Sequence, residues 1–92
     1  MTKQELIKAV QKRTGKNVDD IDIIISAMLE QVKETVSSGE VIEIRGFGSF
    51  FLKTRNEKKA RNISTGEQII VPKHKIPFFK AFTDFRKMVE YE

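Results

Sequence analysis

The chain has 92 residues, no cysteine and a formal net charge of +4. A chain of this length buries only a small core, so we expect one domain spanning residues 1–92. The absence of cysteine excludes disulfides and thiolate metal sites, so a partner subunit is the expected means of completing the core.

Two helices joined by a tight turn are predicted for the N-terminal part of the chain. Thr2 and Glu5 have the spacing of a capping box, and Gly15 ends the first helix. Asn17 is a good N-cap for a second helix, which keeps a 3.6-residue apolar period up to Ser-Ser-Gly at 37–39. The first ten residues lack the apolar core of a signal peptide, which predicts a cytoplasmic protein that is not membrane-bound.

Beyond residue 39 the apolar period changes to two, which predicts strands. Residues 41–44 form a short expected strand, RGFG at 45–48 a turn, and residues 49–53 the next strand of a hairpin. Residues 76–80 are expected to return to this sheet with Pro77 at an edge or a bulge, and Thr83 to cap a short last helix. The predicted fold class is α+β, with a two-helix N-terminal base, a three-stranded antiparallel sheet and a short C-terminal helix.

A long protruding β-hairpin arm is predicted at approximately residues 54–76. Residues 54–61 are polar on both faces and oppose the strand-forming IIVP at 69–72 across the turn NISTG. About nine residues per limb at ~3.3 Å each give an arm of ~30 Å, long enough to follow a groove around a duplex. Residues 53–75 carry seven bases and two acids, a net charge of +5, whereas residues 1–45 have a net charge of −1. A local positive field of this kind favours nucleic acid as the partner, with an acidic membrane surface as the second candidate.

Alternation along an extended limb places most of this charge on one side of the arm. That side carries Glu57 and four cations: Lys53, Arg55, Lys59 and Arg61. Lys58 faces the other way, and the second limb contributes Lys73 and Lys75. Near the tip, Asn62 can take part in the degenerate hydrogen-bonding pattern of a minor groove.

Ile63 is the one large apolar residue in the basic tip KKARNISTG. Proteins that bend DNA through the minor groove insert apolar side chains between base steps and so kink the duplex. Ile63 is therefore a candidate intercalating wedge. The alternative is that Ile63 packs against Ile69 or Ile70 across the hairpin, and the residues alone leave both open.

Little in the sequence supports an enzyme. His74 is the only histidine and there is no cysteine, so neither a metal site nor a nucleophile–base pair can be completed around it. The acidic residues at 19, 20 and 22 lack the glycine and the distal glutamate of a calcium loop. We expect no catalytic residue, no cofactor, no bound metal and no small-molecule substrate.

Three segments, RGFGSFFLKTR, RNISTGEQIIVP and KIPFFK, resemble the bacterial HU and integration host factor family of histone-like DNA-bending proteins. The likeness runs from Thr2 to about Val89 with the same order of elements. The resemblance implies an intertwined dimer, in which the helices form a compact base and two arms embrace double-stranded DNA through the minor groove.

The resemblance also implies residue roles. Arm residues that match DNA contacts are Lys53, Arg55, Lys58, Lys59, Arg61, Asn62 and Lys75. The turn whose backbone amides approach phosphate is matched by Gly46, Gly48 and Ser49, with Arg45 beside it. Cations that flank the duplex are matched by Lys3, Lys80 and Arg86, and aromatic residues of the dimer core by Phe47, Phe50 and Phe79.

The chain departs from the family pattern at two places. Most members have proline directly after Arg-Asn, where this chain has Ile63, which keeps the apolar bulk without the rigid ring. The usual Lys-Pro-Gly before the last helix is here Lys80-Ala81-Phe82, which changes how that helix begins.

The predicted function is that of a non-catalytic architectural protein of the bacterial nucleoid. It is expected to bind and bend double-stranded DNA with little sequence specificity, to compact it and to assist other DNA transactions. One alternative is a site-preferring bender like integration host factor, which would select DNA by its deformability. Another is an RNA-binding module, although the arm contains no aromatic stacking platform. The working form is expected to be a homodimer or a heterodimer with a paralogue.

Overall fold

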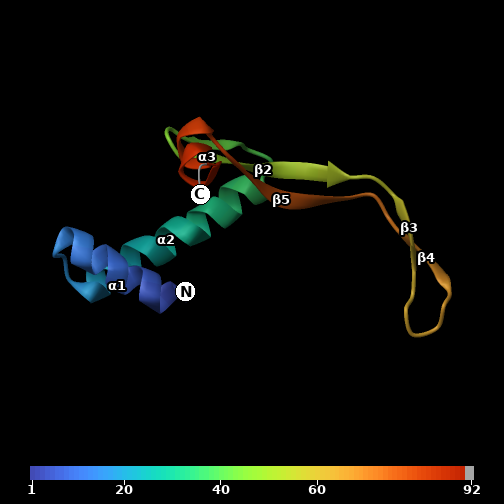
Figure 1. The fold of residues 1–92 in the computed structure, drawn as a ribbon, viewed down its shortest axis with the longest axis horizontal. Helices are drawn as coiled ribbons and strands as arrows, with labels where there is room; N and C mark the ends of the chain where they lie inside the picture. Colours follow the sequence, from blue (N-terminus) through green and yellow to red (C-terminus); the bar gives the residue numbers. More distant parts are fainter. Residues whose placement is uncertain (91–92) are drawn as a thin grey trace. The chain divides into compact units, whose positions relative to one another are not determined.

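The computed structural model describes residues 1–90, which form three helices and five strands (Figure 1). In chain order these are α1 (Lys3–Thr14), α2 (Val18–Ser37), β1 (Ile42–Ile44), β2 (Gly48–Arg55), β3 (Lys58–Arg61), β4 (Gln68–Val71), β5 (His74–Ala81) and α3 (Thr83–Glu90). The chain divides into two compact units, one of residues 1–34 and one that begins at Thr35. The α+β class and the order of elements are confirmed.

The first unit contains α1 and most of α2, and both helices begin as the sequence predicts. The Thr2 hydroxyl accepts a hydrogen bond from the Glu5 amide at 3.2 Å, and the Asn17 carboxamide oxygen accepts one from the Asp19 amide at 2.7 Å. Gly15 ends α1 in the left-handed conformation, with φ of 70°. The buried core of this unit is thin and consists of Ile7 and Ile21, which are 0% and 6% exposed.

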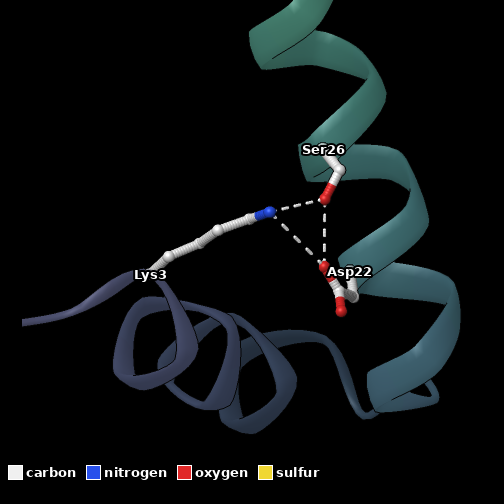
Figure 2. A network of polar contacts seen from close by, with 3 residues as sticks. All are labelled: Lys3, Asp22 and Ser26. Atoms are coloured by element: carbon white, nitrogen blue, oxygen red, sulfur yellow. Dashed lines mark hydrogen bonds and ion pairs between the residues drawn. The ribbon is translucent and has the colours of Figure 1, made fainter.

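A small polar network ties α1 to α2 within the first unit (Figure 2). The Lys3 ammonium donates to the Ser26 hydroxyl at 2.7 Å, and that hydroxyl donates to the Asp22 carboxylate at 3.0 Å. Lys3 Nζ also lies 3.8 Å from Asp22 Oδ1, and both side chains are about half exposed. An ion pair this accessible contributes little to stability, so its main effect is to orient the Lys3 side chain.

The second unit is built on a three-stranded antiparallel sheet in the order β1-β2-β5. The strand β2 is central, pairing from Ile42↔Phe50 to Ile44↔Gly48 on one side and from Gly48↔Ala81 to Arg55↔His74 on the other. Both long strands exceed their predicted ranges by one or two residues at each end. The edge position expected for Pro77 is confirmed, since β5 has a sheet neighbour on one side only.

An aromatic cluster covers one face of this sheet. The Phe50 and Phe79 rings are 4.8 Å apart, Phe47 and Phe79 5.0 Å, and Phe47 and Phe85 of α3 5.3 Å, measured between centroids. Tilted and stacked aromatic pairs at these separations stabilise a fold beyond the area that they bury. The cluster therefore fixes α3 against the sheet.

The start of α3 differs from the prediction that Thr83 caps it. Thr83 is the first helical residue, and the carbonyl of Phe82 accepts the first helical bond, from Arg86 N–H at 3.0 Å. Phe82 in turn donates its own N–H to the Phe47 carbonyl at 2.9 Å. The prediction was wrong by one residue because this tertiary bond, invisible to a local pattern, fixes the backbone at Phe82.

The predicted arm is present as the β3–β4 hairpin, which extends beyond the paired ends of β2 and β5 (Figure 1). It is not one continuous ladder, because residues 56–57 and 72–73 belong to no strand. The pairing register is nevertheless preserved, since Arg55↔His74 is followed by Lys58↔Val71, three positions on in each limb.

The interruption follows from the spacing of the two prolines. In an antiparallel pair, successive N–H groups point alternately toward the partner strand and away from it. Pro72 and Pro77 are an odd number of residues apart, so along one strand their nitrogens point in opposite directions. Only one of the two prolines can therefore place its nitrogen away from the partner strand, where no hydrogen bond is lost. The ladder is intact at the Leu52↔Pro77 pair, so Pro72 is the residue that removes an interstrand hydrogen bond.

Gly48 is required by packing. A Cβ atom at this position would lie 2.5 Å from the Phe79 ring and 2.6 Å from the Lys80 carbonyl oxygen. We therefore expect Gly48→Ala to lower the free energy of unfolding by about 1–3 kcal/mol, the usual effect of overpacking. Guanidinium denaturation at one fixed protein concentration measures this change.

Thr54→Ala is the matched control, because it also changes one β2 side chain but at an exposed position. Its effect should stay within ~1 kcal/mol, the span of β-propensity. Equal stability of Gly48→Ala and the wild type would show that the close contact with Phe79 does not exist in solution.

Candidate nucleic-acid interface

The β2–β5 register brings predicted DNA contacts from distant parts of the chain onto one sheet face. Directly opposed residues point to the same side, and alternate residues along a strand share a face. Lys80 lies opposite Ser49, Lys53 opposite Ile76, and Arg55 opposite His74, all on the face that points away from Phe50 and Phe79. The same alternation in β3 sets Lys59 and Arg61 together. We call these five cations the cation stripe: Lys53, Arg55, Lys59, Arg61 and Lys80.

The remaining arm cations lie elsewhere. Lys58 is opposite Val71, one position along β3 from Lys59, so strand alternation places it on the other face. Lys75 is opposite Thr54 on the face of the aromatic cluster, and Lys73 lies in the interruption between the two ladders. The arm thus presents positive charge on both faces, with the larger share on the cation stripe.

Two aromatic residues that the sequence analysis did not single out lie on the same face as the cation stripe. Phe51 and Phe78 oppose each other across the β2–β5 ladder with ring centroids 5.6 Å apart. The Lys53 ammonium lies 4.4 Å from the centroid of Phe78, a cation–π contact that restrains the lysine before any ligand binds. The sequence did contain a signal for this second aromatic pair, namely two consecutive phenylalanines in each strand. Because adjacent strand residues point to opposite faces, one phenylalanine of each pair must lie on the face opposite the aromatic cluster.

The Ile63 side chain at the arm tip is fully exposed. The alternative that it packs across the hairpin is therefore wrong, and the reason lies in the loop that carries it. Residues 63–65 form a turn closed by the Gly66 N–H, which donates to the Asn62 carbonyl at 2.7 Å, and Gly66 itself is left-handed with φ of 73°. Ile69 and Ile70 are paired in β4 beyond this loop, facing opposite sides.

The turn between β1 and β2 holds the remaining predicted contacts of the sheet. Arg45 and Gly46 are exposed, and Gly46 has a φ of 78° that glycine adopts without strain. Gly48 and Ser49 are buried in the central strand, with Ser49 only 7% exposed. The approach of their amides to phosphate stays a prediction.

The last predicted cations lie on helices. Arg86 is exposed on α3, and Lys3 on α1 is held by Asp22 and Ser26 as described above. The predicted dimer-core residues Phe47, Phe50 and Phe79 contact one another within the chain, and Phe47 keeps 40% of its surface exposed.

The described part of the chain shows no other chemical centre. Residues 1–90 contain no group of three or more His, Asp or Glu side chains that could hold a metal ion. His74 Nδ1 lies 2.8 Å from the Pro72 carbonyl oxygen, a contact in which the Nδ1–H tautomer donates. Within residues 1–90, every helix is too short or too polar to span a membrane.

Comparison with known proteins gives consistent matches along the whole chain. A family model described as Bacterial DNA-binding protein matches residues 1–90. The integration host factor subunit beta of Dichelobacter nodosus is 40% identical over 93 residues, covering 100% of this chain and 97% of that protein. The corresponding subunit of Bordetella petrii is 42% identical over 91 residues, covering 98% of this chain and 76% of that protein.

Solved structures agree with these relatives. The Anabaena HU protein in a cocrystal with DNA has a TM-score of 0.91 and 36% identity, with 97% of both chains covered. The V42I mutant of HU from Thermotoga maritima has a TM-score of 0.72 and 30% identity, covering 97% of this chain and 99% of that one.

Proposed function

The chain belongs to the Bacterial DNA-binding protein family, that of HU and integration host factor, and we propose that it binds and bends double-stranded DNA through the minor groove with little sequence specificity. The observation that carries this proposal is the fully exposed Ile63 at the tip of a hairpin lined with cations. An apolar side chain in this position has no role in the packing of the chain, and a role in DNA explains it.

The cation stripe supplies affinity in this proposal. Its five side chains follow one face of the sheet and arm, and phosphates carry the complementary charge. A protein that contacts six to ten phosphates releases counterions and loses about 10³- to 10⁵-fold in affinity between 50 and 200 mM salt. Lys58, Lys73, Lys75, Lys3 and Arg86 add phosphate contacts outside the stripe.

Ile63 supplies the bend. Apolar wedges in the minor groove unstack one base step, which costs a few kcal/mol, and the resulting kink brings more of the duplex onto the protein. Arg61, the last residue of β3, lies beside the wedge, where a cation suits the negative potential of a narrow groove.

Low sequence specificity follows from the kind of contacts available. Lysine and arginine on phosphate carry no sequence information, and the minor groove distinguishes little beyond A·T from G·C. A site-preferring bender remains the alternative, because relatives named integration host factor subunit beta reach 40–42% identity. Competition between random DNA and a site with flexible TA or CA/TG steps distinguishes the two, since only the alternative predicts a strong preference.

A second copy of this chain, or a paralogue, completes the fold in our proposal. The described residues bury only three hydrophobic side chains almost completely: Ile7, Ile21 and Val36. Meanwhile α2 leaves Ile23 and Ile24 each 67% exposed, and an open groove of about 490 Å³ lies beside them in the first unit. Exposed apolar surface of this extent is typical of an interface.

We further propose that the protein acts without catalysis, in the cytoplasm and on the nucleoid. Family membership supports this. Compaction of DNA and help to other DNA transactions follow from bending itself.

The dimer proposal predicts a particle of twice 10.6 kDa in sedimentation equilibrium at micromolar concentration. Ile24→Glu should shift the equilibrium toward monomer and lower the unfolding midpoint, because it would bury an unpaired charge in the interface. Glu34→Gln on the same helix is the control and should leave the mass unchanged. A wild-type mass of one chain would overturn the proposal.

The cation stripe predicts a salt effect at Lys59. Lys59→Ala should reduce the slope of log affinity against log salt by about 0.9, the contribution of one phosphate contact. Lys33→Ala removes the same charge from α2, where Lys33 pairs with Glu30 at 2.6 Å, and should leave the slope unchanged. Identical slopes for wild type and Lys59→Ala would show that this residue does not contact phosphate.

The wedge proposal predicts the effect of Ile63→Ala on bending. End-to-end fluorescence transfer across a doubly labelled random duplex of about 35 base pairs should rise on wild-type binding, and rise much less with the variant, because alanine is too small to wedge open a base step. Ile70→Ala is the control, since it truncates another exposed isoleucine of the arm, 60% exposed, but within a paired strand. Wild-type bending by Ile63→Ala would rule out the wedge, and no binding at low salt would rule out the DNA-binding proposal.

A further inference from the structure

Asn62 holds the arm-tip loop through its side chain. Its carboxamide oxygen accepts a hydrogen bond from the Ser64 N–H at 2.9 Å. This bond spans Ile63, the residue between them, so the backbone on both sides of the exposed isoleucine is fixed by one short polar side chain. Asparagine and aspartate favour such turns because their side chains mimic the backbone of a β-turn.

The backbone of Asn62 is engaged as well. Its N–H donates to the Glu67 carbonyl at 2.8 Å, and its carbonyl accepts from the Gly66 N–H at 2.7 Å. The Thr65 hydroxyl accepts a further bond from the Glu67 N–H at 3.3 Å. Asn62 differs from Thr65 in that it bonds to Gly66 and Glu67 at the end of the loop and also to Ser64, the residue after the isoleucine.

We infer that Asn62 is a positioning residue for the Ile63 wedge, an inference that rests on the proposed function. Ile63 makes no packing contact that could hold it, since its side chain is fully exposed. An unrestrained loop loses backbone entropy for each residue that becomes ordered on binding. A turn that is already formed reduces this loss, so the wedge meets the base step in the required backbone conformation.

Asn62 can hold the loop and contact a base with different groups. Its carboxamide oxygen accepts one hydrogen bond within the loop, which uses one of its two lone pairs. The amide nitrogen makes no bond in the loop that this positioning needs, so its donors serve base reading alone, whereas the positioning role depends on the oxygen.

Two substitutions separate these roles. Asn62→Ala removes both groups, whereas Asn62→Ser retains an oxygen that can accept from the Ser64 N–H but has no amide donor. With the doubly labelled random duplex at saturating protein and low salt, we expect Asn62→Ala to lose most of the change in transfer efficiency. Asn62→Ser should keep most of it, and the Ser64 amide should exchange with solvent faster in free Asn62→Ala than in free Asn62→Ser.

A double-mutant cycle tests whether Asn62 acts through Ile63. In an Ile63→Ala background, Asn62→Ala should cause no further loss of bending. Additive losses, equal losses in Asn62→Ala and Asn62→Ser, or wild-type bending by Asn62→Ala would each overturn the inference. If Ile63→Ala alone bends DNA like the wild type, the wedge proposal fails and this inference with it, whereas reduced bending by Ile63→Ala with normal bending by Asn62→Ala removes only the inference.

Discussion

The antiparallel register between β2 and β5 is the constraint on which the rest of the second unit depends. Because side chains alternate along a strand, a single register decides that Phe50 and Phe79 face the aromatic cluster while Lys53, Arg55 and Lys80 face the other way. A slip of one residue would exchange the two sets. The Phe79 ring lies where a side chain at position 48 would be, so glycine and ring together fix the register. The packing of the core and the placement of the charge are therefore set by one contact.

A chain with so small a buried core is left with many exposed apolar side chains, and two sets of them bear on the proposed function. One set lies on α2, where Ile23 and Ile24 are exposed and a second subunit covers them in the proposed dimer. The other lies on the arm, where the sheet is two strands wide and cannot bury both of its faces. The proposed dimerisation and the proposed insertion into DNA have the same physical origin, because each covers apolar surface that a single small chain cannot cover by itself.

Local patterns were sufficient to predict most of the fold. Capping residues such as Thr2 and Asn17 and the left-handed Gly15 act within one helical turn, so their roles are readable from neighbouring residues. The start of α3 was not readable, because Phe82 is fixed by a bond to Phe47 far away in the sequence. Predicting that Lys80 and the arm cations share a face likewise requires the strand register. Predicting that Ile63 is exposed requires the geometry of the tip loop. Individual DNA contacts stay predictions, since they depend on a partner molecule.

The interruption at Pro72 has a consequence for the timing of DNA binding. The tip hairpin and the sheet are each held by their own ladder, and the segments that join them, residues 56–57 and 72–73, lack ladder bonds. The tip can therefore change its direction without breaking either ladder. Cations of the sheet would meet phosphates first, at a rate governed by charge and diffusion, and the wedge would enter the groove in a later, slower step. With this order of steps, the association rate depends on the sheet cations and the dissociation rate on the wedge, because only the second step kinks the duplex.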